Sequence, residues 1–350
     1  MLSRTADHLF WMARYTERAE NTARMLDVHV QTSLMPQSAE DIEQGWRAIL
    51  GISELQHAYD NKYHSINAKD AIDFLVRDLS NPSSIASCLK QARENARAVR
   101  GALTTEVWEI QNATWLKMEA YLKTDALEKN PPEFFEWVKH RSHLSRGVTN
   151  GTMLQDEAFH FIRLGTFLER ADNTARILDV KFHGAKENHH RHNKHHTKRN
   201  QQQGQQAAQP RGTDDVEAMD GNREPQIDFY YWAAILRSVS AFEIYRKVYR
   251  DVITPARVAD LLMLHPDMPR SLLACLNGVT ENLKAVHNDV SADTERFAGK
   301  LHADLQFSNI DEILDAGLHD YLTVFFARIF ELGNRISRDF LVPMAPPTAR

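Results

Sequence analysis

The sequence has little cysteine and no long hydrophobic run. Cys88 and Cys275 are the two cysteines in 350 residues, and neither stands in a redox motif. A disulfide framework or a thiol nucleophile is therefore disfavoured, and we expect both to be small buried side chains. No apolar run reaches the roughly 18 residues that cross a membrane. The first apolar stretch carries charges and lacks a small-residue cleavage site, which argues against a secretory signal and favours a cytoplasmic protein.

Signatures of nucleic-acid binding and of common enzymes are also absent. The chain holds 42 Lys and Arg against 47 Asp and Glu, a net charge of −5, so nucleic acid is not expected as a main partner. It has no Gly-x-Gly-x-x-Gly, no Walker loop and no Gly-x-Ser-x-Gly. We therefore expect no ATP held by a phosphate loop and no cofactor in this chain.

The proline positions and the apolar spacing both predict helices. All 12 prolines fall between periodic segments or at their first turn, where a helix tolerates them. From Ser3 to about Val30, apolar residues recur every three or four positions without Pro or Gly. Ser38–Asp41 and Asn67–Asp70 have the spacing of capping residues and predict further helix starts. No strand alternation with hairpin turns occurs. The predicted fold class is all-α, a bundle of long helices.

One stretch of the chain occurs twice. Residues 8–28, HLFWMARYTERAENTARMLDV, align without a gap with residues 160–180, HFIRLGTFLERADNTARILDV, and we name them the first and second repeat. Residues 46–50 and 84–99 likewise match residues 232–236 and 271–286. We therefore predict two homologous halves, residues 1–150 and 151–350, related by pseudo-twofold symmetry.

The repeats share polar residues as well as an apolar pattern. The matched polar positions are Glu17, Arg18, Glu20, Asn21 and Arg24 in the first repeat and Glu169, Arg170, Asp172, Asn173 and Arg176 in the second. On a helix, most of each set falls within about 100° of arc and forms a polar ridge. Apolar residues stand at both ends of that side, so we expect protein to cover the ridge and its charges to pair or to bind a ligand. Ordinary pairs along one helix, a lock between the halves and a ligand site all remain open.

Metal binding by the repeats is disfavoured. A ferritin-like dimetal centre needs Glu-x-x-His on two helices, and the third residue after each repeated glutamate is Glu20 or Asp172. Carboxylate with asparagine suits Mg²⁺ only weakly, because Mg²⁺ usually also needs phosphate oxygens. The acid-Asn dipeptides at 94–95 and 281–282 either extend the polar ridges or form solvated helix faces.

A polar insertion interrupts the second half at about residues 184–225. It is rich in His, Gln, Asn, Lys and Arg and too poor in apolar residues to offset the entropy of ordering, so we predict disorder. Six histidines in or beside it are candidate ligands of Zn, Ni or Cu, namely His183, His189, His190, His192, His195 and His196. They have no carboxylate or cysteine partner at fixed helical spacing. We therefore interpret the segment as solvated, binding metal only adventitiously.

Three segments carry a resemblance to a known family. They are MLSRTADHLFWMARYTERAENTAR at the start, FLERADNTARILDVKFH at 167–183 and YWAAILRSVSAFE at 231–243. Together they resemble the bacterial alpha-E domain proteins over nearly the whole chain. The resemblance implies an all-helical cytoplasmic protein, encoded beside a circularly permuted ATP-grasp protein and a transglutaminase-like protein. Such neighbours suggest a pathway that forms or cleaves amide bonds on a peptide or amino-acid-derived product. The family's name marks glutamates, here Glu17 and Glu169.

Three functions follow from the ridges and the resemblance. In the first, the protein is a non-catalytic partner or substrate-binding subunit of an ATP-grasp type amide or peptide ligase, with ATP and Mg²⁺ bound by the partner and Arg24 and Arg176 gripping a carboxylate. In the second, it is itself an enzyme of amide chemistry, with Glu17 or Glu169 as general base. In the third, it is a purely structural scaffold. We favour the first because positioning residues are present and a nucleophile is not.

Overall fold

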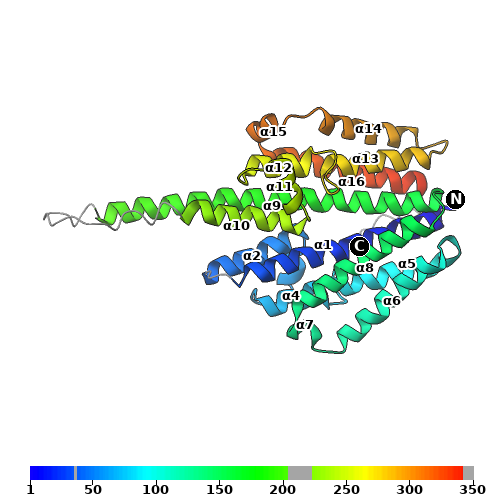
Figure 1. Cartoon of the computed structure of the whole chain (residues 1–350), viewed down its shortest axis with the longest axis horizontal. Helices are drawn as coiled ribbons and strands as arrows, with labels where there is room; N and C mark the ends of the chain where they lie inside the picture. The colour runs from blue at the N-terminus through cyan, green and yellow to red at the C-terminus, as the bar shows by residue number, and fades with distance from the viewer. Residues whose placement is uncertain (35–37, 204–222, 342–350) are drawn as a thin grey trace, which may run out of the picture.

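The computed structural model describes the backbone of residues 1–34, 38–203 and 223–341, and within these ranges all regular structure is helical (Figure 1). The predicted all-α class is confirmed. The helices are α1 (Ser3–Thr32), α2 (Ala39–Ile52), α3 (Gln56–Asp60), α4 (Ala68–Val76), α5 (Ile85–Ala98), the 3-10 turn η1 (Arg100–Ala102), α6 (Thr105–Leu122), α7 (Ala126–Lys129), α8 (Pro131–Thr152), α9 (Glu157–Gln203), α10 (Arg223–Ser238), α11 (Phe242–Val248), α12 (Pro255–Met263), α13 (Leu272–Ala285), α14 (Ala292–Gln306), α15 (Ile310–Ala316) and α16 (Leu318–Phe340).

The helix starts follow the local signals in the sequence. Ser38 and Asp41 form a reciprocal capping box: the Asp41 amide donates to Ser38 Oγ at 3.1 Å, and Asp41 Oδ2 accepts from the Ser38 amide at 3.3 Å. Asn67 caps α4 by accepting from the Asp70 amide at 2.9 Å. Both predicted helix starts are confirmed, because each cap satisfies an amide that the first turn leaves unpaired.

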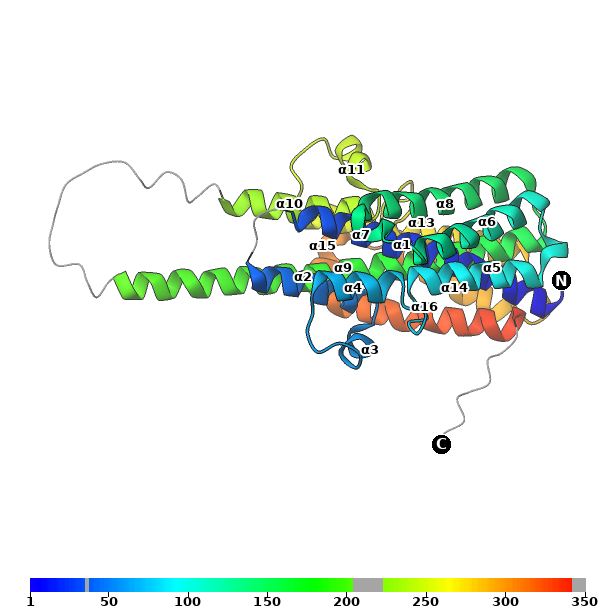
Figure 2. The ribbon, with the colours of Figure 1, turned by 90° about the horizontal axis from the view of Figure 1, so that it is seen from below.

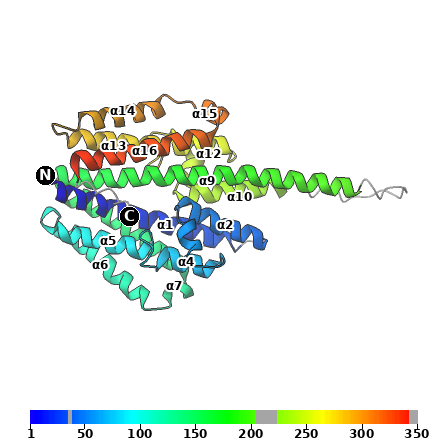
Figure 3. The ribbon, with the colours of Figure 1, turned by 180° about the vertical axis from the view of Figure 1, so that it is seen from behind.

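The first and second repeats form the centre of the molecule. They lie on α1 and α9, which pack side by side and run in the same direction from the end where Met1 contacts Glu157 (Figures 1 and 2). Helices α5, α6 and α8 lie on the α1 side, whereas α13, α14 and α16 lie on the α9 side (Figure 3). The contact between α1 and α9 therefore has further helices on both sides.

The backbones of α1 and α9 approach most closely at Gly165. A Cβ atom built on Gly165 would stand 2.3 Å from the carbonyl oxygen of Phe10, far inside contact distance. Only glycine permits this approach, because every other residue carries a Cβ. The close contact lies one turn before Glu169 and Arg170 on α9, so it helps to fix the register in which the two repeats meet.

Both cysteines are buried and unoxidised. The sulfur of Cys88 lies 3.8 Å from the Pro82 carbonyl oxygen, and that of Cys275 lies 3.9 Å from the Pro269 carbonyl oxygen. Burial raises the pKa of each thiol to about 12, so both stay protonated near neutral pH. The prediction of small buried side chains is confirmed.

The histidine-rich segment is described only in part. The backbone of α9 continues to Gln203 and α10 begins at Arg223, whereas residues 204–222 lie outside the described residues. The side chains of the six candidate histidines also lie outside them, so disorder and adventitious metal binding stay predictions. Elsewhere in the described chain, no three His, Cys, Asp or Glu side chains are placed to hold a metal ion. No helix there has the length and apolarity needed to traverse a bilayer.

Candidate functional site

The Glu-Arg pairs of the two repeats bind each other reciprocally across the α1–α9 contact. Arg170 donates to both oxygens of Glu17, from Nε and Nη2, each at 3.0 Å. Arg18 donates to both oxygens of Glu169, from Nε at 2.6 Å and from Nη2 at 3.1 Å. Such two-pronged contacts are the strongest that a guanidinium makes with a carboxylate. The two repeats are therefore held together by an exchanged pair of buried salt bridges.

A second pair of contacts joins the last arginine of each repeat to the other half of the chain. Each arginine reaches a residue that follows the end of a helix, α10 or α2. Arg24 donates from Nη1 to Ser240 Oγ at 2.6 Å, and Arg176 contacts the Glu54 carboxylate. Glu54 and Ser240 occupy matching positions, each eight residues after the tryptophan of its matched segment, and both have positive φ, 54° and 56°. The contacts match, but only Glu54 brings a negative charge.

Three residues of the first repeat's ridge belong to a largely buried group of six charged residues, in which only Arg146 is partly exposed. We name this group the arginine cluster: Glu17, Glu20, Arg24, Arg146, Arg170 and Arg270. Arg270 precedes α13 and donates to Glu17 Oε1 at 2.8 Å and to Glu20 Oε1 at 2.6 Å. Arg146 on α8 donates from Nη1 to Glu17 Oε2 at 3.0 Å and also contacts Glu20. Four guanidinium groups thus surround two carboxylates whose side chains are at most 1% exposed.

Three further polar side chains complete the surroundings of the arginine cluster. Ser142 donates to Glu20 Oε2 at 2.6 Å, and His143 Nε2 lies 2.8 Å from Arg24 Nη2. Asn21 accepts from Arg270 at 2.8 Å. Its buried Nδ2 group has no hydrogen-bond partner among the described residues. One buried donor beside the arginine cluster therefore lacks an acceptor among the described residues.

The charges of the arginine cluster hold its carboxylates ionised. Burial raises the pKa of Glu17, but Arg170, Arg270 and Arg146 outweigh it and leave the pKa below its ordinary value. Burial also raises the pKa of Glu20, and Arg270 with hydrogen bonds from neighbouring side chains brings it well below the ordinary range. A carboxylate so stabilised is a weak base, which gives little support to Glu17 as a general base.

The ridge of the second repeat is arranged differently. Glu169 accepts from Arg14 at 2.7 Å in addition to Arg18, and belongs to a separate group of charges. Asp172 and Arg176 pair at 2.8 Å but are about a quarter exposed, and Asn173 is half-buried. The ten matched positions therefore do not converge on one cavity. Guanidinium groups outnumber carboxylates on both sides, four to two in the arginine cluster and two to one at Glu169.

Two expectations about individual groups need correction. Arg24 is not available to bind a carboxylate ligand with two hydrogen bonds, because all three of its guanidinium nitrogens contact protein groups. Arg176 already pairs with both Asp172 and Glu54. The asparagines at 95 and 282 do not extend the ridges. Their Oδ1 atoms accept from Nδ1 of His8 and His160 at the starts of the repeats, at 2.7 and 2.8 Å.

Sequence reasoning did not find Arg14, Arg146 and Arg270. Arg270 had a usable signal, because it immediately precedes the matched segment at 271–286, where the first half has Ser83 before its copy. Arg146 lies on α8 among other polar residues and carries no such signal. The difference between Arg270 and Ser83 therefore shows, in the sequence, where the charged surroundings of the two repeats differ.

The acid stability of the fold is expected to depend on Glu169. Burial raises the pKa of Glu169, but Arg18 and Arg14 bring it from 4.5 to about 2. Since the folded state binds this proton more weakly than the unfolded chain, the contribution of Glu169 to stability is complete above about pH 4.5 and is lost as the pH falls toward 2. In urea unfolding at stepped pH, Glu169→Gln should flatten the fall between about pH 5 and pH 2. An unchanged slope would contradict this assignment.

The chain belongs to the Alpha-E family. The model of this family, described as a predicted alpha-helical domain with a conserved ER motif, matches residues 1–341. Glu-Arg dipeptides stand at 17–18 and 169–170, in the exchanged salt bridges between α1 and α9. The resemblance seen in the sequence is confirmed. No curated protein and no solved structure matches the chain.

Proposed function

We propose that this protein is a non-catalytic, substrate-binding partner of an ATP-grasp type ligase that forms amide or peptide bonds. The main support is the arginine cluster, in which four guanidinium groups surround two carboxylates and the Asn21 Nδ2 donor is unpaired among the described residues. Buried donors in excess favour an anionic ligand close by. Peptides and amino acids carry such a group as a carboxylate.

The enzyme alternative has less support from this geometry. Both repeated glutamates accept two-pronged contacts from arginine, and both have lowered pKa values, so neither is poised to take a proton. The two cysteine thiols are buried and protonated near neutral pH. The ligase partner is proposed to supply ATP, Mg²⁺ and the chemical step. The reciprocal salt bridges also suit the scaffold alternative, which the following assay separates from binding.

The test is a reconstituted ligation. The purified chain is incubated with peptide and amino-acid candidates, alone and with the ATP-grasp protein, ATP and Mg²⁺. We expect amide formation only when both proteins are present, and about tenfold less with Arg146→Gln, because one charge-assisted contact is worth about 1.5–3 kcal/mol. Arg47→Gln, which removes an exposed pair with Glu43 at 2.8 Å, is the control and should be neutral.

Each alternative function has its own result in this assay. Turnover by the lone chain would overturn the non-catalytic role. Full activity of the complex with Arg146→Gln, at unchanged helical content by circular dichroism, would favour the scaffold. Failure of the two proteins to co-purify would contradict the partnership.

A further inference from the structure

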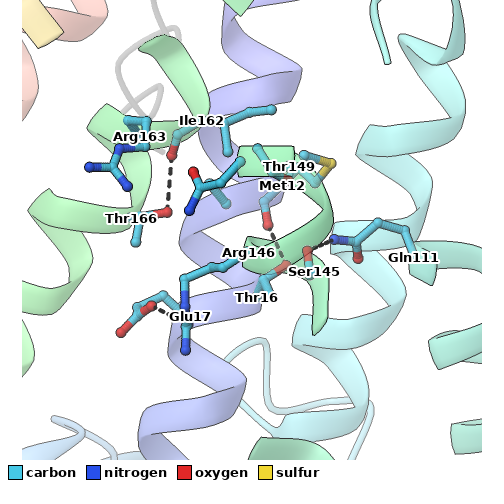
Figure 4. Close-up of a pocket in the computed structure, with 12 residues that line it drawn as sticks. Met12, Thr16, Glu17, Gln111, Ser145, Arg146, Thr149, Ile162, Arg163 and Thr166 are labelled. Carbon is cyan, nitrogen blue, oxygen red and sulfur yellow. Dashed lines mark hydrogen bonds and ion pairs between the residues drawn. The ribbon is translucent and has the colours of Figure 1, made fainter. Parts of the chain in front are cut away.

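A small pocket adjoins the arginine cluster between α1, α6, α8 and α9 (Figure 4). Its volume is about 30 Å³, which is room for about two water molecules. Arg163 lines it from α9 and Gln111 lies on the opposite side, on α6, with Arg146 and Glu17 between them (Figure 4). Two oxygen atoms of a carboxylate would occupy the space of two waters.

Two guanidinium groups of this pocket have capacity for a further anion. Within the described part of the chain, the hydrogen bonds and ion pairs of Arg146 all use Nη1, which leaves Nε and Nη2. Arg163 is half-buried and forms no ion pair with any described residue. Its guanidinium lies 4.6 Å from the centre of the Phe167 ring. Burial and the nearby Arg170 lower the pKa of Arg163, and Glu281 offsets this only in part, so a further negative group beside it would be stabilising.

The hydroxyl groups of the pocket differ in what they can donate. Thr16 and Thr166 donate to carbonyl oxygens of their own helices, at 2.9 and 3.0 Å, so their protons are taken. Ser145 accepts from Gln111 at 2.9 Å, which leaves its own hydroxyl proton for a group in the pocket. The lining of the pocket therefore includes Arg146 and Ser145 of α8 and Arg163 of α9 as donors, beside Thr149 and Asn150 of α8.

The repeat alignment shows that the surroundings of Glu17 and Glu169 differ at two positions of the pocket lining. Where the second repeat has Arg163 and Thr166, the first has Trp11 and Arg14. The long Arg14 side chain reaches Glu169 at 2.7 Å and lies 4.9 Å from the Trp11 ring centre. There the protein supplies its own guanidinium, whereas Thr166 is too short to reach Glu17. Beside Glu17, the position matched to Arg14 therefore leaves space that a guanidinium group fills beside Glu169.

We propose that this pocket binds a carboxylate group of a peptide or amino-acid-derived ligand, with Arg163, Arg146 and Ser145 as its donors, and that each chain binds one such ligand. The choice of a carboxylate rests on the proposed function, whereas the donors and the single site rest on the geometry above. The pocket holds the carboxylate and leaves the rest of the ligand outside, toward the exposed Asn150 at the rim.

The test is isothermal titration of the full chain with triglycine and with triglycinamide, its uncharged C-terminal amide. We expect one triglycine per chain, at least tenfold weaker binding of triglycinamide, and about tenfold weaker binding of triglycine to Arg163→Gln. The matched control is Arg237→Gln, because Arg237 also stacks on a ring, 4.9 Å from the centre of Phe242, but is exposed and away from the pocket. A second variant, Thr166→Arg, supplies the side chain found in the first repeat and should abolish binding.

Several results would overturn the proposal. They are equal affinity for triglycine and triglycinamide, unchanged binding by Arg163→Gln, two equivalents per chain, or tight binding of inorganic phosphate in place of triglycine. Because the titration uses the chain without a ligase, its failure would not affect the proposed partnership. Conversely, a failed ligation assay would leave a measured carboxylate site intact.

Discussion

Glu17→Gln is expected to destabilise the fold by about 3–5 kcal/mol, more than any other single polar change considered for this protein. The substitution removes the negative charge that Arg170, Arg270 and Arg146 share, at a side chain that is 1% exposed. Arg170 and Arg270 would remain buried and Arg146 about a quarter exposed, with only Glu20 to compensate them. Removing one partner of a buried ion pair costs more than the pair contributes, because the remaining charges are cut off from water.

Urea unfolding followed by circular dichroism measures this effect. The control is Glu43→Gln, which removes the carboxylate of a half-exposed pair along α2 with Arg47 at 2.8 Å and should change stability by less than about 1 kcal/mol. Similar small changes in both variants would mean that the arginine cluster is hydrated and does not hold the two repeats together.

Gly165→Ala is expected to cost about 3 kcal/mol, because the new methyl group would stand 2.3 Å from the Phe10 carbonyl oxygen and 3.2 Å from the Ala13 Cβ. The first of these atoms is backbone in the middle of α1, so it cannot turn away as a side chain can. The contact is relieved only if α1 and α9 move apart, which would also lengthen the exchanged salt bridges.

The matched control for Gly165→Ala is Gly147→Ala. A Cβ at Gly147 would meet nothing within 4 Å, and this residue lies exposed on α8. Here alanine should stabilise by about 0.5–1 kcal/mol through its higher helix propensity. Opposite signs for the two substitutions in urea unfolding are the expected outcome. Equal and small effects would contradict the close approach of the two helices.

Much of the architecture was predictable because its signals are local. The periodic apolar positions of α1, the capping box at Ser38 and the Asn67 cap each depend on residues within a few positions of one another. Helix starts satisfy nearby amides, so short segments of sequence hold the necessary information. The repeats also located the central pair of helices, since α1 and α9 carry them.

The site was predictable only in part. Matching Glu17 with Glu169 correctly singled out residues in buried ion pairs, but it suggested equal surroundings for both. In the structure the two glutamates have different partners, because some of those partners lie outside the segments that match between the halves. Arg146 and Arg270 approach from α8 and from the turn before α13. Spacing along one helix says which residues share a face, not what packs on that face.

The sequence by itself determined an all-helical chain in which one charged motif occurs twice. Helix periodicity and caps depend on neighbouring residues, and the duplication is read from two matching segments. Only the tertiary structure decided that Glu17 pairs with three arginines while Glu169 pairs with two, and that Glu17 lines a pocket. The physical reason is that Coulomb energy and burial depend on distances between segments far apart in the chain. Those distances are set when α1 and α9 pack at Gly165 and the surrounding helices cover them.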